Sequence, residues 1–290
     1  MVDGRAVSRA SWTAPVLPSA FAATCVVLAV ACASSSRDGF SAPSADGGAT
    51  FATDTGTPSS GPPSGEVYGH SDTVLYVVDT ATHEVREVSA FQGCTHVADI
   101  ALDDSSTIYG STGAELFLIE NNSARCTRIA SGSFPNSLSF VPAGTLEAGV
   151  EALVGYQGGD YVRIDPRSGA VTKVGELGGG FESSGDIVSV KDGKSFLTVK
   201  GPDCADCLVE VDPKTGALVK NWGSLGHANA YGLAFWGGEL YAFTDAGDVV
   251  LVKLSGDKLE TTLLPVPNAP ADLAFRGAGS TTVAPPGNVK

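Results

Sequence analysis

Basic residues, methionine and long apolar runs are scarce in this 290-residue chain. It has one methionine, and 18 lysines and arginines stand against 32 aspartates and glutamates, a formal charge of −14. Such a chain repels a phosphate backbone unless its few cations are concentrated, and the sequence contains no basic patch, so nucleic acid is not an expected partner. A hydrophobic content of 43% with 36 glycines and 16 prolines excludes collagen, a coiled coil and a wholly disordered chain.

The longest apolar run near the N-terminus has 12 residues, from residue 20 to residue 31, and follows Arg5 and Arg9. A bilayer span needs about 20 apolar residues, so this run is too short to be a transmembrane anchor. Basic residues followed by a short apolar core are typical of a secretory signal. We therefore expect residues 1–31 to be a signal peptide.

The run closes as Leu-Ala-Val-Ala before Cys32, and Ala33 follows. This ending resembles the bacterial lipoprotein signal. The resemblance implies that Cys32 carries the lipid and becomes the first residue, and that Ala33, which stands where Asp would favour inner-membrane retention, sends the protein to the outer membrane, facing either the periplasm or the cell surface. The alternative is an ordinary cleaved signal peptide with an incidental cysteine. Several acyl chains on one cysteine would make a stable anchor.

Residues 32–65 form the lipidated cysteine and a segment rich in Ser, Gly, Ala, Thr and Pro, with only Phe40 and Phe51 as large apolar residues. This composition cannot bury enough surface to offset chain entropy. We expect a disordered tether, and a coil of this length reaches roughly 30 Å.

Beyond residue 65 the chain repeats itself. Five segments combine an apolar strand with a polar turn: residues 75–79, 116–120, 161–165, 208–212 and 251–255, whose starts are 41, 45, 47 and 43 residues apart. Two of the turns read Asp-Pro-x-x-Gly, at Asp165 and Asp212, and residues 80–83 are a looser copy. In such turns the proline presets φ, the aspartate bonds following amides and the glycine accepts positive φ.

A second unit lies between the first ones, at residues 99–102, 137–140, 186–189, 232–235 and 272–275, each followed by a turn and another strand. Four short strands recurring every 40 to 50 residues predict an all-β propeller. The pattern over residues 66–285 resembles secreted bacterial β-propellers with NHL-, YVTN- or regucalcin-like repeats, a family of uncertain function. Residues 286–290 are a tail.

The two units are out of phase, which predicts how the ring closes. The outer pair at residues 73–88 comes first, and the inner pair at residues 272–283 comes last. Pairing these N-terminal and C-terminal strands makes a fifth blade and leaves few open sheet edges. The alternative is a six-bladed ring with a degenerate blade near residues 145–151.

Asp99, Asp186 and Asp272 begin three of the predicted inner strands, where side chains encircle the axis. Three carboxylates there repel one another by about 2 kcal/mol per pair at an effective dielectric constant near 20. They therefore need protons, water, the amides of the next blade or a cation such as Ca²⁺, which prefers oxygen ligands. Ca²⁺ is the one cofactor that the sequence suggests, and local capping of loops is the alternative.

His96, His227 and Asn229 lie in predicted loops that lead into inner strands. Either histidine could serve as a general base beside a carboxylate, or have a structural role, since no Gly-x-Ser-x-Gly nucleophile motif accompanies them. The aromatic residues near these loops, Trp222, Trp236, Tyr231 and Phe181, could offer a stacking surface for a sugar or an aromatic ligand.

Four cysteines remain once Cys25 is lost with the signal and Cys32 takes the lipid. Cys204 and Cys207 are expected to form a local disulfide in a loop, because no second metal-ligand pair accompanies them. Cys94 and Cys126 are the remaining pair, and whether they meet is open, because a disulfide tolerates only about 7 Å between Cα atoms.

These features favour a membrane-tethered extracytoplasmic propeller that acts as a binding or interaction module with a protein or glycan ligand. The alternative is a calcium-dependent hydrolase of the lactonase, esterase or glycosidase type, with Asp99, Asp186 and Asp272 holding the ion. A structural envelope protein that presents the ring to a partner subunit is a third possibility, which an apolar patch on one face would favour. Whether the chain is an enzyme stays open.

Overall fold

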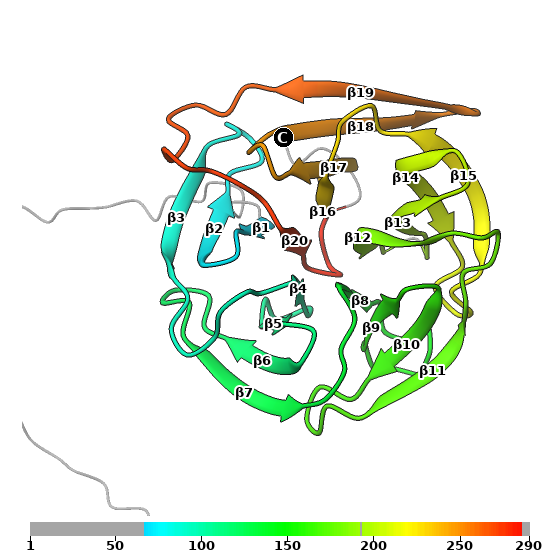
Figure 1. Ribbon diagram of the computed structural model, residues 1–290, viewed down its shortest axis with the longest axis horizontal. Coiled ribbons are helices and arrows are strands. Elements are labelled where there is room, and N and C mark those ends of the chain that lie inside the picture. Colours follow the sequence, from blue (N-terminus) through cyan, green and yellow to red (C-terminus); the bar gives the residue numbers. More distant parts are fainter. Residues whose placement is uncertain (1–66, 192, 286–290) are drawn as a thin grey trace, which may run out of the picture. The chain divides into compact units, whose positions relative to one another are not determined.

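The computed structural model describes residues 67–191 and 193–285, which form five four-stranded antiparallel sheets arranged as the blades of a β-propeller (Figure 1). The prediction of a five-bladed, all-β propeller is confirmed. The predicted signal peptide, the tether of residues 32–65 and the tail lie outside the described residues. Within the described part, no helix is long and apolar enough to cross a membrane.

Each blade places its first strand nearest the axis and its fourth on the rim (Figure 1). In this order, blade 1 contains β20 (Gly277–Ser280), β1 (Val67–His70), β2 (Val74–Val78) and β3 (Val85–Ala90); blade 2 contains β4 (Asp99–Leu102), β5 (Ile108–Ser111), β6 (Glu115–Ile119) and β7 (Cys126–Ser131); blade 3 contains β8 (Ser137–Val141), β9 (Ala152–Gln157), β10 (Asp160–Ile164) and β11 (Val171–Glu176); blade 4 contains β12 (Glu182–Ser189), β13 (Ser195–Gly201), β14 (Cys204–Val211) and β15 (Leu218–Ser224); and blade 5 contains β16 (Ala230–Trp236), β17 (Glu239–Thr244), β18 (Val249–Ser255) and β19 (Lys258–Leu264).

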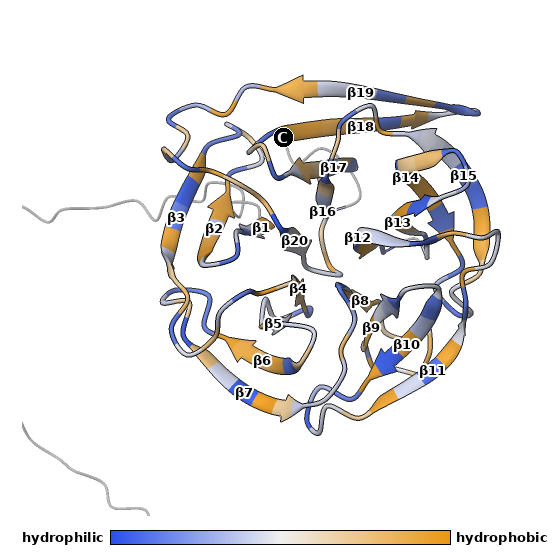
Figure 2. Cartoon of the chain, viewed as in Figure 1, coloured by the Kyte–Doolittle hydropathy of each residue, from blue (hydrophilic) through white to orange (hydrophobic). Residues whose placement is uncertain are grey.

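Hydropathy follows the position of a strand in its blade. The inner strands β4 and β8 are buried at every residue, because both of their faces pack against neighbouring blades. The rim strands β11 and β19 are mostly exposed, and Figure 2 shows hydrophilic and hydrophobic segments mixed along the rim. Five apolar clusters result, one between each pair of adjacent blades.

The predicted Asp-Pro-x-x-Gly turns join the third and fourth strands of blades 3 and 4. The Asp165 carboxylate accepts the amides of Arg167 and Ser168 at 2.8 and 3.0 Å, and Asp212 accepts the amide of Lys214 at 2.8 Å. We name the side of the ring that carries these turns the turn face. The opposite side, formed by the loops that lead into the inner strands, is the loop face.

The ring closes by pairing β20 with β1, in a register that sets His70 opposite Gly277. The predicted closure by pairing of N-terminal and C-terminal strands is confirmed, but one C-terminal strand meets three N-terminal strands instead of two from each end. Residues 272–275 precede the true inner strand, which is built from Gly, Ala and Ser because inner strands approach closely at the axis: a Cβ on Gly232 would collide with Ala278. A six-bladed ring is also wrong, because residues 145–151 lie in the connection between β8 and β9.

Both cysteine pairs form disulfides. Cys94 and Cys126, with Cα atoms 5.7 Å apart, join the segment after β3 to the start of β7 and so link blade 1 to blade 2. Cys204 and Cys207 are bonded as predicted, but on strand β14 itself rather than in a loop. All described strands, both disulfides and the five apolar clusters lie within the compact unit Gly56–Lys290, so this unit contains every contact that holds the ring together.

Candidate functional site

Two aspartates and a histidine meet at the axis of the ring and form what we call the axial cluster. Asp99 begins β4, Asp186 lies in β12 and His70 ends β1, and all three side chains are fully buried. The amide of Leu138 on blade 3 donates to Oδ2 of Asp99 at 2.6 Å. The amide of Leu233 on blade 5 donates to Oδ2 of Asp186 at 2.7 Å in the same way. Each aspartate therefore ties its own inner strand to that of the next blade.

The other polar atoms of the axial cluster face one another without a formed hydrogen bond. Nε2 of His70 lies 3.9 Å from Oδ1 of Asp99, and within the described chain these two atoms and Oδ1 of Asp186 have no hydrogen-bond partner. The His70 Nδ1 donates to the carbonyl of Ser71 at 2.9 Å, which leaves Nε2 unprotonated in the neutral ring. Gly277 fits against this cluster because it has no Cβ, which would collide with Asp99 and His70.

Burial decides the protonation of the axial cluster. It raises the pKa of Asp99 well above the ordinary value, and the charge of Asp186 raises it further. Burial also raises the pKa of Asp186, but its interaction with the Asp99 carboxyl group, followed by the backbone amides around it, such as that of Leu233, opposes this rise. The proton of the pair therefore belongs to Asp99. Burial lowers the pKa of His70 to about 4, so His70 and Asp99 are not an ion pair near neutral pH.

Asp272 does not join the axial cluster. It is exposed in the loop between β19 and β20, so the expectation that it begins an inner strand is wrong. Among residues 67–191 and 193–285, no group of three or more His, Cys, Asp or Glu side chains is placed to hold a metal ion. The calcium site expected at Asp99, Asp186 and Asp272 therefore stays a hypothesis whose third ligand lies away from the other two.

Directly above the axial cluster, the loop face has a depression of about 330 Å³, which we call the axial depression. Its lining comes from the residues that precede the inner strands and from neighbouring loops: Asp72, His96, Val97, Ala98, Asn136, Ser184, Gly185, Tyr231 and Arg276. The Arg276 guanidinium lies 3.5 Å from the Asp72 carboxylate and over the ring of Tyr231. His96 is thus at the predicted place, on an open and polar surface.

His227 and Asn229 lie in the loop between β15 and β16, outside the residues that line the axial depression. The backbone amide of Asn229 donates to Asp206 at 2.9 Å, and its side-chain amide donates to Asp245, also at 2.9 Å. These hydrogen bonds fix the position of the loop between blades 4 and 5, so Asn229 has a structural role.

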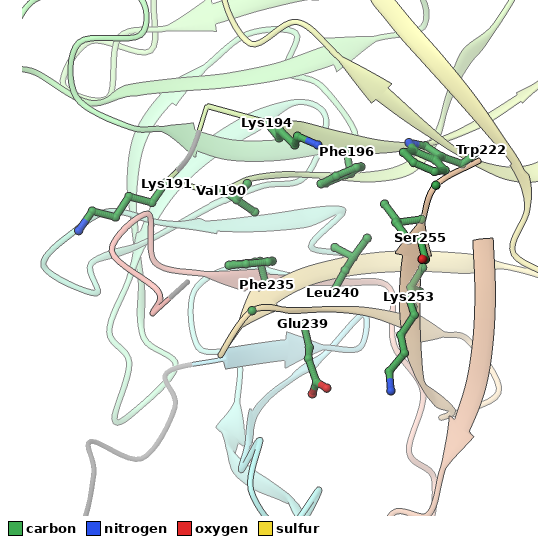
Figure 3. A pocket seen from close by; sticks show the side chains of 14 residues that line it. Val190, Lys191, Lys194, Phe196, Trp222, Phe235, Glu239, Leu240, Lys253 and Ser255 are labelled. Atoms are coloured by element: carbon green, nitrogen blue, oxygen red, sulfur yellow. The ribbon is translucent and has the colours of Figure 1, made fainter. Parts of the chain in front are cut away.

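A hollow larger than the axial depression lies between blades 4 and 5 on the turn face. This interblade pocket has a volume of about 690 Å³ and is lined by Val190, Lys191, Lys194, Phe196, Trp222, Phe235, Gly238, Glu239, Leu240, Val252, Lys253, Leu254, Ser255 and Gly256. Figure 3 shows Val190 and Phe196 on one side of it and Phe235 and Leu240 on the other. The lysines come from the β12–β13 turn and from β18, so the pocket has an apolar interior and a charged rim.

Trp222 stands at one end of the interblade pocket. The Nζ of Lys220 lies 3.5 Å from the centre of its ring and also bonds the Asp257 carboxylate at 2.8 Å. The Nε1–H of Trp222 is buried and meets no acceptor within the described residues. A buried donor without a partner costs about 1–3 kcal/mol.

The sequence pointed to some of these residues and missed others. Trp222 and Tyr231 were expected to share a stacking surface, but they lie in separate hollows on opposite faces, while Trp236 and Phe181 pack against the apolar clusters. His70 was missed, because nothing in Val-Tyr-Gly-His shows that its strand borders the axis. The pocket itself was missed, because its walls come from segments up to 66 residues apart, Val190 and Gly256.

Comparisons with known proteins add little to this geometry. No family profile matches the chain, and neither does any curated protein. Among solved structures, the chain is similar to a symmetrical protein studied for its de novo evolutionary emergence (17% identity, TM-score 0.48, 74% of this chain and 98% of that one). It is also similar to TolB from Acinetobacter baumannii (15%, 0.43, 72% and 51%) and to a protein of unknown function from Bacteroides caccae (14%, 0.40, 72% and 76%). These values are too low to assign a function.

Proposed function

We propose that this protein is a lipid-tethered extracytoplasmic binding module whose propeller holds a small, partly apolar molecule in the interblade pocket. The observation that carries the proposal is the pocket itself. Its volume of about 690 Å³ lies within the range of roughly 300–1,000 Å³ typical of small-molecule sites, which combine apolar walls with a few polar groups. The axial depression has about half that volume and a lining of mixed polarity.

Two features of the chain support an extracytoplasmic place. The first is the lipoprotein-like signal that ends at Cys32, with Ala33 in the position that favours the outer membrane. The second is the pair of disulfides, which persist in oxidising compartments and are rare in the cytosol. In this proposal the tether of residues 33–65 holds the ring clear of the lipid headgroups.

The rival function, a calcium-dependent hydrolase, has one observation in its favour, the unpartnered oxygens of Asp99 and Asp186. Catalysis by these groups requires substrate and water within hydrogen-bond reach. Both side chains are fully buried beneath the axial depression, so the inner strands would have to separate before a substrate could touch them. A binding role requires no such movement, because the interblade pocket is already formed.

A neutral fluorescent probe, N-phenyl-1-naphthylamine, tests the pocket. The chain of residues 56–290, exported to an oxidising compartment so that both disulfides form, should bind this probe saturably and transfer energy to it from Trp222. Ser255→Phe places a ring at the exposed rim of the pocket and should weaken binding at least tenfold. Ser168→Phe, an equally exposed serine on the turn face of blade 3, is the matched control. Equal binding by both variants would contradict the proposal.

The tether is tested separately in the full chain. Cys32→Ser should abolish metabolic labelling with an alkyne fatty acid and release the protein from the membrane fraction. An unchanged membrane fraction for this variant would contradict the lipid anchor but would leave the pocket proposal intact.

A further inference from the structure

We infer that the interblade pocket selects an anion that carries a flat apolar ring, such as an aromatic carboxylate or sulfonate. This inference rests on the proposed function, because it names the chemistry of the ligand held in that pocket. Two features carry it: the charge of the rim, and the shape and polarity of the walls.

The rim of the pocket is cationic on an acidic protein. Lys191, Lys194 and Lys253 line it with the carboxylate of Glu239, and Glu210 pairs with Lys194, so these five side chains carry 3 − 2 = +1 while the chain carries −14. Glu239 accepts a hydrogen bond from the Tyr241 hydroxyl at 3.0 Å, and Lys194 lies 3.8 Å from Glu210. A positive rim around low-dielectric walls concentrates anions and repels cations.

The walls favour a planar apolar group. Three aromatic side chains line the pocket, Phe196 from β13, Trp222 from β15 and Phe235 from β16, with aliphatic side chains filling the space between them (Figure 3). Aromatic rings pack against one another in offset or edge-to-face arrangements that add to the burial of apolar area. A flat ring between blades 4 and 5 meets such partners on more than one side.

The neutral polar lining is too sparse for a sugar. Ser255 supplies the only hydroxyl among the 14 lining residues, and no asparagine or glutamine is among them. A sugar would leave most of its hydroxyl groups without partners, which is costly in a buried site. The ammonium groups of the lining lysines are donors, and an anionic oxygen accepts from donors of this kind.

The test compares two probes of similar ring size on residues 56–290. The anionic probe is 1-anilinonaphthalene-8-sulfonate, and the neutral one is N-phenyl-1-naphthylamine. We expect the sulfonate to bind at least fivefold more tightly at low salt and to lose this advantage at 1 M NaCl, where charges are screened beyond about 3 Å. Residues 56–290 contain two tryptophans, Trp222 and Trp236, so the pocket is identified by comparing energy transfer in Trp222→Phe, which should lose most of the signal, with that in Trp236→Phe.

Charge variants separate attraction by the lysines from simple apolar burial. Lys194→Gln and Lys253→Gln should each weaken the sulfonate about two- to fivefold, in line with exposed charge pairs, and should leave the neutral probe unchanged. Lys194→Arg should restore binding. Lys214→Gln, an exposed lysine of the Asp212 turn outside the pocket lining, is the matched control for the change in net charge.

Each outcome decides between the two proposals. Equal affinity for both probes, unaffected by the lysine variants, would overturn the anion inference and leave the binding module standing. Failure of both probes to bind in the pocket, seen as binding insensitive to Ser255→Phe, would overturn both. Because the sulfonate also binds loosely packed states, each variant must retain cooperative thermal unfolding and its near-UV circular dichroism.

Discussion

The two oxygens of the Asp99 carboxyl group lie in different surroundings. One oxygen accepts the amide of Leu138 and joins blade 2 to blade 3, which suits an acceptor of any charge. The other faces His70 and Asp186 in a fully buried space, which disfavours a second negative charge. A protonated Asp99 satisfies both roles, and this explains why the ring tolerates two carboxyl groups at its axis.

This protonation makes stability depend on pH. Because the pKa of Asp99 is raised in the folded protein, its stabilising contribution is complete below the unfolded value near 3.9 and is lost as the pH rises toward the folded value. Asp99→Asn keeps an acceptor for Leu138 and cannot ionise. We expect its free energy of unfolding in urea to match or exceed that of the native chain at pH 8 and to change less between pH 6.5 and 9.

The window above pH 6.5 is chosen because of His70. Its pKa is lowered to about 4, so its contribution is lost as the pH falls from about 6.5 toward 4, in the opposite sense. Asp99→Ala is the comparison variant, since it leaves the Leu138 amide unpaired and should cost about 1–3 kcal/mol at every pH. An Asp99→Asn chain that is as unstable as Asp99→Ala would show that the ionised carboxylate is needed.

At the residue scale, the sequence could place Asp99 and Asp186 at the axis because each begins a buried apolar segment, although Asp186 lies inside β12 and not at its start as expected. The same reasoning failed for Asp272, although Asp-Leu-Ala-Phe resembles Asp-Ile-Ala-Leu at residues 99–102. The inner strand of blade 1 must pass close to its neighbours, and only the small residues of β20 allow this. This steric requirement arises only when the ring closes, so it cannot be deduced from a local sequence pattern.

At the scale of elements, the pairing of β20 with β1 is the step that closes the ring, and Gly277 is its tightest point. A methyl group there would meet Asp99 and His70. Overpacking of this kind typically costs 1–3 kcal/mol, so Gly277→Ala should lower the Tm by several degrees. Gly159→Ala is the control, because a Cβ there makes only an ordinary contact with the Phe181 carbonyl. Equal Tm values for the two variants would contradict this account.

The two disulfides should differ in their effect on stability. Cys94 and Cys126 are 32 residues apart and link two blades, whereas Cys204 and Cys207 are 3 apart within one strand. Loop-closure entropy predicts about 3–4 kcal/mol for the longer loop and about 2 kcal/mol for the shorter one. Urea unfolding of the paired Cys→Ser variants measures both. A larger loss for the Cys204 and Cys207 variant would reject the entropic explanation.

The strands that form these elements were largely predictable, because alternation and turn residues are local signals. The Asp165 and Asp212 turns have the predicted hydrogen bonds. The bond between Cys94 and Cys126 could not be deduced, because it depends on the distance between two blades. Strand β20 consists of Gly, Ala and Ser and lacks the β-branched residues that mark a strand, so the inner strand of blade 1 was assigned to the wrong residues.

At the scale of the whole molecule, repeat spacing predicted the number of blades but not the place of the hollow between two of them. Each gap between blades is filled by an apolar cluster. The cluster between blades 4 and 5 stops short of the turn face, where Phe196, Leu240 and Val252 border the interblade pocket. The position of the pocket depends on how closely distant segments pack against one another. The periodicity of the sequence contains no information about that packing.

Removal and return of calcium tests the whole ring. The carboxylates of Asp99 and Asp186 are held by amides of the next blades, and Asp272 is exposed elsewhere, so we expect a chelator to leave the Tm of residues 56–290 unchanged. An ion present at 100 times its Kd would contribute about 2.7 kcal/mol, or several degrees in Tm for a domain of this size.

The result decides between the two roles of the axial aspartates. A Tm that falls on chelation and recovers with Ca²⁺ but not with Mg²⁺ would contradict the amide-linked structural role and would favour the hydrolase. Asp99→Asn and Asp186→Asn should then abolish the calcium response, while Asp272→Asn, at the exposed position, would show whether the loop before β20 folds inward to supply a third ligand. If the Tm is unchanged, the axial pair stabilises the ring by hydrogen bonds between blades, and ligand binding is to be sought in the interblade pocket.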